Sequence, residues 1–258
     1  MLRPKFISLI IAAAVLLSLL SLVDAQTAVK ISVGDRVVRG ASIKPYKNRW
    51  KVTLATPTGQ SIDGGVWTDE VEIIDFHGRK ALRRTQVKMN PSKPFETIIN
   101  IVDPKTFAPI MSESKTADGT FWRREFNGPV VHVQQVDTPG GKLQEFQTTF
   151  DVPVFDFFGG MYGILLRTFP LKEGYSATFP ADFQDNSGKE FVQWAVVNVR
   201  SRENVNAAPN KQVETWIVDA DLPSGSGSYR FWISDGPPYI VKLVYTGPRG
   251  GKQIFEMM

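Results

Sequence analysis

The most constraining feature of this sequence is the alternation of apolar and polar residues along most of its length. Tyr46, Trp50, Val52 and Leu54 share one parity, and the run Phe191–Val199 alternates with the same period. A period of two places successive side chains on opposite faces of a sheet, so each run predicts a strand. Further runs of this kind are Val71–Ile73, Val131–Val133, Trp216–Val218 and Tyr229–Ile233.

Turn-forming residues separate these alternating runs. Clusters of Gly, Pro, Asn and Asp occur at 57–59, 63–65, 118–119, 127–129, 139–141 and 235–237. Many are about 10–20 residues apart, a spacing that favours antiparallel hairpins. Long helices that could connect parallel strands are missing from the pattern. We therefore expect about twelve strands in one large antiparallel sheet, curled because an open sheet of this size rarely stays flat.

One segment, Val154–Arg167, has helical rather than strand periodicity. Its apolar stripe consists of Phe157, Met161, Ile164 and Leu165, Asp156 is placed to cap its start, and Pro170 follows its end. Three glycines, Gly159, Gly160 and Gly163, each weaken the helix by about 1 kcal/mol relative to Ala. The pattern predicts one short helix that packs on the concave face of the sheet. Its low intrinsic stability suggests the hypothesis that this helix is a movable lid.

The first 25 residues have the pattern of a signal peptide. Arg3 and Lys5 precede an apolar run over residues 6–23, and Val23-Asp24-Ala25 matches the residues that signal peptidase accepts. We expect cleavage after Ala25, a single domain over residues 26–258, and a periplasmic or secreted protein of a bacterial envelope without a transmembrane span. The alternative is a retained membrane anchor, because the apolar run approaches the ~18 residues of a membrane-spanning helix.

Composition excludes several functional classes. The chain contains no cysteine, so it has neither disulfides nor a thiol nucleophile. A net charge of +4 over 258 residues is too small to indicate a nucleic-acid partner. Phosphate-binding loops of the Gly-x-x-x-x-Gly-Lys-Ser/Thr type and dinucleotide-binding glycine motifs are also missing from the sequence. We expect no cofactor.

The titratable residues do not form a recognisable catalytic motif. His77 lies in a predicted turn, and His132 lies within a predicted strand. The sequence has no Gly-x-Ser-x-Gly element and no His-x-x-x-His pair, so neither a hydrolytic triad nor a zinc site is indicated. The acidic residues Asp69, Glu70 and Glu72 alternate with apolar residues, as on a solvated strand face. We expect a protein that is not an enzyme and has no metal site.

Basic residues are concentrated in two segments, which we interpret as a basic rim. The residues concerned are Arg79, Arg83, Arg84, Arg123 and Arg124. Because both parities are charged, we expect these residues at an edge or end of the sheet beyond the core. Such a rim would attract anionic head groups or an acidic envelope protein. The alternative is that these charges serve solubility and protect a strand edge.

Aromatic residues are abundant, with 17 Phe, 6 Trp and 6 Tyr. They either fill a core or line a cavity for an apolar ligand, because the concave side of a half-barrel is too large for strand side chains alone. Our candidate ligand-binding residues are Phe155, Phe158, Met161, Ile164, Leu165, Trp194 and Trp232.

Three motifs resemble a family of exported bacterial proteins catalogued as domain of unknown function 3108. Residues 102–110 read VDPKTFAPI, residues 160–174 read GMYGILLRTFPLKEG, and residues 229–242 contain YRFWISD followed by PYIVK. The resemblance covers residues 95–258. It implies an antiparallel half-barrel similar to the lipoprotein carriers of the LolA and LolB type, whose concave apolar side, covered by short helices, takes acyl chains. It implies no catalytic residues.

These observations predict an exported, non-catalytic β half-barrel that binds an apolar or amphipathic, lipid-like ligand. The alternative is a cell-envelope module that binds a protein partner and has a filled core without a ligand. The two differ in whether the concave side contains a cavity.

Overall fold

The computed structural model describes residues 28–90, 93–156, 161–184, 190–208, 211–222 and 225–258. Within these residues it contains one sheet of fifteen strands, three more than the approximate number that the sequence predicts. The strands are β1 (Val29–Lys30), β2 (Tyr46–Ala55), β3 (Ser61–Phe76), β4 (Arg79–Asn90), β5 (Lys93–Val102), β6 (Pro109–Thr116), β7 (Phe121–Asn127), β8 (Val130–Val136), β9 (Gln144–Thr149), β10 (Ser176–Gln184), β11 (Glu190–Ala208), β12 (Lys211–Leu222), β13 (Gly227–Ser234), β14 (Ile240–Thr246) and β15 (Lys252–Met257). The described helices are a 3-10 turn, η1 (Gly40–Ser42), and α2 (Met161–Arg167).

The sheet consists of two meanders that are joined in its middle. Its order is β1-β10-β11-β12-β13-β14-β15-β2-β3-β4-β5-β6-β7-β8-β9, and every pair is antiparallel except β1 with β10. We call β2–β9 the N-terminal wing and β10–β15 the C-terminal wing. The last strand, β15, pairs with β2, so the two wings form one continuous surface. The prediction of a mainly β, large and curled antiparallel sheet is confirmed, with one short parallel pair added.

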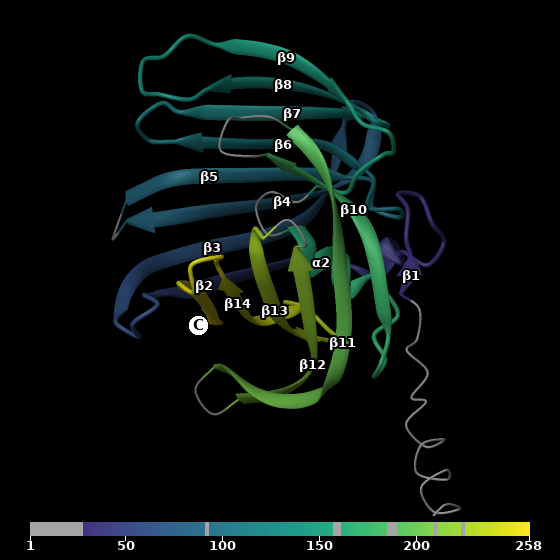
Figure 1. Cartoon of the computed structure of the whole chain (residues 1–258), viewed down its shortest axis with the longest axis vertical. Coiled ribbons are helices and arrows are strands. Elements are labelled where there is room, and N and C mark those ends of the chain that lie inside the picture. Colours follow the sequence, from purple (N-terminus) through teal and green to yellow (C-terminus); the bar gives the residue numbers. More distant parts are fainter. Residues whose placement is uncertain (1–27, 91–92, 157–160, 185–189, 209–210, 223–224) are drawn as a thin grey trace, which may run out of the picture.

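Between β9 and β10 the chain contains helix α2 and the extended residues before it, which lie on the concave side of the sheet. Figure 1 shows α2 on this inner side, between the two wings. Before the helix, Phe155 forms a parallel bridge to Ala181 of β10, so the backbone there is extended. The predicted helix within 154–168 is therefore confirmed for Met161–Arg167, whereas Phe155 belongs to a bridge and residues 157–160 lie outside the described residues.

Helix α2 is the centre of the main hydrophobic core. All residues from Met161 to Leu166 are buried, although the sequence pattern predicted only one apolar stripe. A helix that is apolar on every side is one that the fold surrounds. Tyr162 packs against Phe179 of β10 and Tyr229 of β13, with ring centroids 5.7 and 6.0 Å apart. Among the described helices, none is long and apolar enough to cross a bilayer.

Gly163 allows α2 to approach the sheet closely. A Cβ atom at this position would lie 2.1 Å from the Cδ1 atom of Ile240 and 3.1 Å from the ring of Phe231. The sequence interpretation counted Gly163 only as a weakness of the helix. The structure gives it a packing role that no other residue type can perform unless the buried side chain of Ile240 moves.

We predict that Gly163→Ala lowers the free energy of unfolding by about 1–3 kcal/mol, because overpacking exceeds the ~1 kcal/mol that Ala contributes to helix propensity. Chemical denaturation measures this difference. Ile240→Val removes the Cδ1 atom that the new methyl group meets. The loss in the double variant should therefore be smaller than the sum of the two single losses. An increase in stability on Gly163→Ala would contradict the close approach.

Candidate functional site

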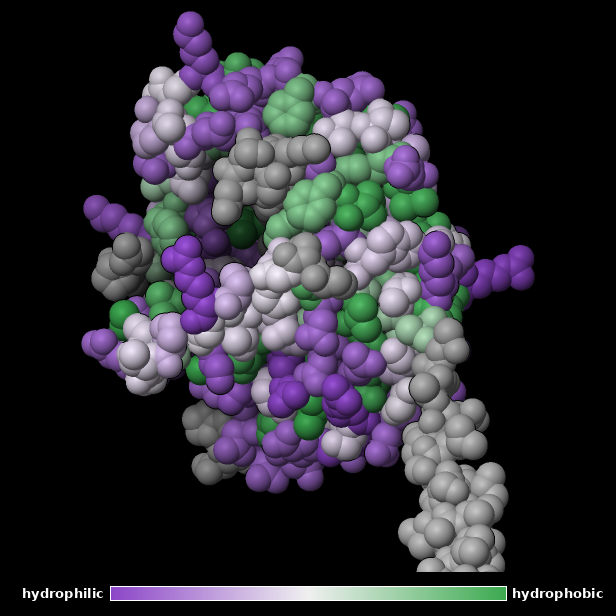
Figure 2. Space-filling view, in the orientation of Figure 1, coloured by the Kyte–Doolittle hydropathy of each residue, from purple (hydrophilic) through white to green (hydrophobic). Residues whose placement is uncertain are grey.

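A cavity of about 410 Å³ lies between the two wings on the concave side. Figure 2 shows the molecule hollowed on this face, with hydrophobic and hydrophilic residues inside the hollow. The cavity residues come from both wings and include Trp50, Trp67, Arg84, Gln86, Lys88, Glu96, Ile98, Trp122, Phe183, Leu222, Tyr229, Ile240, Leu243, Tyr245 and Phe255. Strands that are distant in the sequence therefore build one cavity.

Aromatic rings form much of the cavity wall. Phe255 of β15 packs edge-on against Trp67 of β3, with ring centroids 4.9 Å apart, and against Trp50 of β2 at 6.4 Å. On the C-terminal wing, the rings of Tyr229 and Tyr245 are 4.7 Å apart. These large side chains have few rotatable bonds, so the wall is rigid and offers an extended apolar surface.

The N-terminal wing contributes a polar strip to the same cavity. Lys88 forms an ion pair with Glu96, and its ammonium lies 4.4 Å from the centre of the Trp67 ring. The Ser114 hydroxyl donates a hydrogen bond of 2.8 Å to Glu96. The carbonyl oxygen of the Gln86 side chain is buried and has no hydrogen-bond partner within the described residues. One side of the cavity can thus form hydrogen bonds, whereas the opposite side is aromatic.

A row of polar residues crosses the concave face of the N-terminal wing. Arg84, Asn100, Ser112 and Arg124 occupy successive paired positions on β4, β5, β6 and β7. All four are buried. Buried polar groups need partners, and three of the four find them outside their own strands. The side chain of Asn100, for example, donates a hydrogen bond of 2.6 Å to Asp156, which precedes α2.

Arg84 forms a buried, bidentate ion pair with Asp69 of β3. Its Nε and Nη2 atoms each lie 2.7 Å from an oxygen of the carboxylate. The Tyr46 hydroxyl donates to the same carboxylate at 3.1 Å, and burial together with this charge raises the pKa of Tyr46. Burial, the largest single effect, lowers the pKa of Arg84, but the charges and hydrogen bonds of Asp69 and Tyr46 together outweigh it, so the net pKa is raised. Arg84 is therefore a charged interior residue.

Arg124 connects the two wings through acidic residues of the opposite wing. Its Nε and Nη2 atoms lie 2.9 and 2.8 Å from Glu190 of β11, and its Nε lies 3.5 Å from Asp182 of β10. Burial raises the pKa of Glu190 to about 8, and the nearby Asp182 adds to this effect. Burial also raises the pKa of Asp182. We call Arg124, Asp182 and Glu190 the wing latch.

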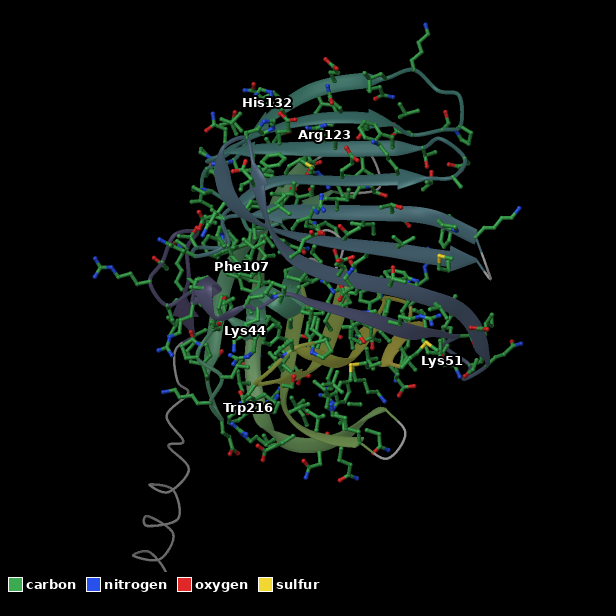
Figure 3. The ribbon with its side chains drawn as sticks, turned by 180° about the vertical axis from the view of Figure 1, so that it is seen from behind. Lys44, Lys51, Phe107, Arg123, His132 and Trp216 are labelled. Carbon is green, nitrogen blue, oxygen red and sulfur yellow. The ribbon has the colours of Figure 1, made fainter. Side chains whose placement is uncertain are left out.

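The predicted basic rim is wrong for two of its five residues. Arg84 and Arg124 point to the concave side and are buried, because strand parity places them opposite Arg83 and Arg123. The prediction that these residues lie on an edge strand is also wrong, because β4 lies between β3 and β5, and β7 lies between β6 and β8. Arg79 is exposed, Arg83 pairs with Glu72 at 2.8 Å, and Arg123, labelled in Figure 3, pairs with Glu125 at 2.7 Å.

The structure separates the predicted ligand-binding residues into two groups. Phe155, Met161, Ile164 and Leu165 are buried in the core around α2, but none of them lines the cavity. Trp194 and Trp232 lie on the convex face, where Lys30 and Lys242 stack on their rings at 4.3 and 5.4 Å. Phe158 lies outside the described residues. Sequence reasoning thus missed most of the cavity walls, which come from β2–β5, β7, β10 and β12–β15.

Both histidines are exposed, and neither belongs to a metal-binding group in the described part of the chain. His77 is an exposed turn residue with a φ of 52°, and His132 of β8 is exposed on the outer face (Figure 3). The described residues contain no group of three His, Cys, Asp or Glu side chains that could hold a metal ion.

Comparisons with known proteins give one family and two structural likenesses. The family model described as "Protein of unknown function (DUF3108)" matches residues 46–247, so the similarity begins well before residue 95, where sequence inspection lost it. A crystal structure of a beta-barrel-like protein of domain of unknown function DUF1849 from Brucella abortus has a TM-score of 0.49 and 10% identity, covering 87% of this chain and 97% of that one. The hypothetical lipoprotein YmcC from Escherichia coli has a TM-score of 0.36 and 8% identity, with 84% and 89% covered. No curated protein matches the sequence.

The wing latch generates a prediction about pH. A carboxyl group whose pKa is raised on folding binds more protons in the folded state, so the free energy of unfolding falls as pH rises. For Glu190 the window extends from its ordinary value of 4.5 to about 8. We expect a loss of about 1 kcal/mol per pH unit in this window, measured by urea denaturation.

Glu190→Gln should make this dependence less steep, because the amide stays neutral and only the raised pKa of Asp182 in the latch still contributes to it. Glu173→Gln, at an exposed position, is the matched control and should follow the wild-type profile. A Glu190→Gln profile as steep as that of the wild type would show that Glu190 does not titrate in this window.

Proposed function

This chain belongs to the DUF3108 family of proteins of unknown function, and we propose that it is an exported, non-catalytic protein that holds an apolar or amphipathic ligand between its two wings. The observation that carries this proposal is the aromatic cavity of about 410 Å³. Small-molecule sites are commonly concave, mostly apolar and several hundred Å³ in volume.

The distribution of polar groups around the cavity favours an amphipathic ligand. The wall formed by Tyr229, Tyr245 and Phe255 suits a hydrocarbon chain, whereas Gln86 and the Lys88–Glu96 pair lie on the opposite wing. The buried side-chain oxygen of Gln86 is an acceptor that a ligand hydroxyl or amide would satisfy. Because Lys88 and Arg84 are each paired with an acid, the cavity offers hydrogen bonds rather than an unpaired charge.

Export is part of the same proposal. Residues 1–25 would direct the chain to the bacterial envelope and be removed, leaving residues 26–258 as one β domain. A protein that releases or transfers an apolar molecule in the envelope needs no bound cofactor.

The alternative function is an envelope protein-interaction module with a filled core. It requires a concave side that its own side chains occupy completely, and the cavity between the wings supports the ligand-binding proposal over it. The burial of Arg84 and Arg124 also removes two charges from the surface on which such a module would depend.

A pair of tryptophan substitutions on β14 tests the proposal. Leu243 lines the cavity and faces Phe255, whereas the next residue, Val244, faces the opposite side of the sheet, opposite Ile254. Leu243→Trp should fill part of the cavity and weaken binding of the neutral fluorescent probe N-phenyl-1-naphthylamine by about tenfold, because steric overlap removes contact area. Val244→Trp is the matched control and should bind the probe like the wild type.

Melting temperatures of both variants show whether they remain folded. Probe binding that is equally strong in Leu243→Trp and in the wild type would place the probe outside the cavity and contradict the proposal. Native mass spectrometry of the purified protein, followed by organic extraction, identifies any ligand that copurifies.

A further inference from the structure

A second cavity, of about 380 Å³, lies at the C-terminal end of α2. We call it the basic pocket and define it by Arg39, Arg167, Lys172, Arg202, Trp216 and Asp235. These residues come from the segment before η1, the end of α2, the segment after it, β11, β12 and the turn between β13 and β14. Trp216, labelled in Figure 3, lies at the end of the molecule opposite Arg123 and His132.

Positive charge exceeds negative charge in the basic pocket. Four cationic residues line it, and Asp235 is the acidic residue among them, 3.8 Å from Arg167 and 3.5 Å from Arg202. Glu214 also pairs with Arg202, so the local balance is 4 − 2 = +2. In the described part of the chain, Arg39 and Lys172 take part in no ion pair.

Two of the guanidinium groups are held in place before any ligand arrives. Arg202 stacks on the ring of Trp216, with its Cζ atom 4.4 Å from the ring centroid. Arg167 donates from Nη2 to the backbone oxygen of Asp235 at 2.9 Å, and its Nε is buried without a partner among the described residues. Preorganised groups lose little rotamer entropy on binding.

The free carbonyl groups at the C-terminal end of a helix carry partial negative charge and repel anions, but at the end of α2 this repulsion is weak. The backbone N–H and the hydroxyl of Thr168 both donate to the oxygen of Leu165, at 2.8 and 2.6 Å. The N–H of Phe169 donates to the oxygen of Leu166 at 3.1 Å. These carbonyl groups are therefore already engaged, and the four cationic side chains dominate the potential in the pocket.

We propose that the basic pocket binds a phosphate group. The planar guanidinium fork matches phosphate oxygens in pairs, and a phosphate monoester carries about two negative charges, which match the local excess. This site is separate from the aromatic cavity and does not depend on a ligand there. The phosphate can belong to a soluble molecule or to a lipid head group.

The test uses a double variant and a matched control. In Arg39→Gln/Lys172→Gln, two cations without an ion pair are removed, so the fold should persist. In Lys51→Gln/Arg79→Gln, the same two residue types are changed at exposed positions outside the pocket (Lys51 is labelled in Figure 3). Titration calorimetry with inorganic phosphate at constant ionic strength should show about tenfold weaker binding for the first variant and unchanged binding for the second.

Vesicle flotation then distinguishes the two sources of phosphate. Binding to vesicles of phosphatidylcholine with phosphatidylglycerol, but not of phosphatidylcholine alone, and its loss in Arg39→Gln/Lys172→Gln, would assign a lipid head group. Binding of inorganic phosphate without vesicle binding would assign a soluble phosphate compound. The proposal is overturned if the wild type binds neither probe, or if both double variants weaken binding equally, since general surface charge would then explain it.

Discussion

The polar row on the concave face of the N-terminal wing determines much of the remaining structure. Because Arg84, Asn100 and Arg124 are buried, each requires a partner that their own hairpins do not all provide. The segment before α2 provides Asp156 for Asn100, and the opposite wing provides Glu190 for Arg124. Removing one partner of a buried hydrogen bond typically costs about 1–3 kcal/mol, because the other partner is left unsatisfied. Buried polarity thus positions the helix segment and joins the wings, in addition to the hydrophobic core.

The same row explains why the concave side is not filled by apolar side chains. Gln86 and Ser114 lie two residues along their strands from the row, on the same face, and Lys88 and Glu96 lie beyond them toward the cavity. Polar groups at these positions cannot be covered by hydrocarbon without losing hydrogen bonds, which costs more than the burial contributes. A cavity that admits water or an amphipathic molecule satisfies them, so the cavity follows from the strand pattern itself.

Strand parity made the sheet predictable, but long-range pairing could not be deduced from it. Alternation puts Arg83 and Arg84 on opposite faces, but the sequence interpretation grouped both in one basic rim. Parity cannot show which face is concave, because the partner of Arg124, Glu190, is 66 residues away. The face of the sheet on which Trp194 lies was ambiguous from the sequence, because residues of both parities in β11 are apolar. Only the pairing of β11 with β10 and β12 decides that face. The cavity walls were missed because β15 pairs with β2, a contact between strands that are far apart in the sequence.

The burial of α2 argues against the hypothesis that the helix is a lid. The six consecutive residues Met161–Leu166 are buried, each of the five larger side chains has at most 2% of its surface exposed, and Gly163 lies against the sheet. Exposing a single buried Leu or Ile side chain costs about 1.5–3 kcal/mol, so swinging Ile164, Leu165 and Leu166 into water would cost as much as a typical domain's whole stability. The low helix propensity of the glycines does not change this, because packing rather than propensity holds α2.

The cavity already opens between the wings (Figure 2), where Lys88 and Glu96 are partly exposed. A ligand that enters there passes side chains that can move without unfolding the core.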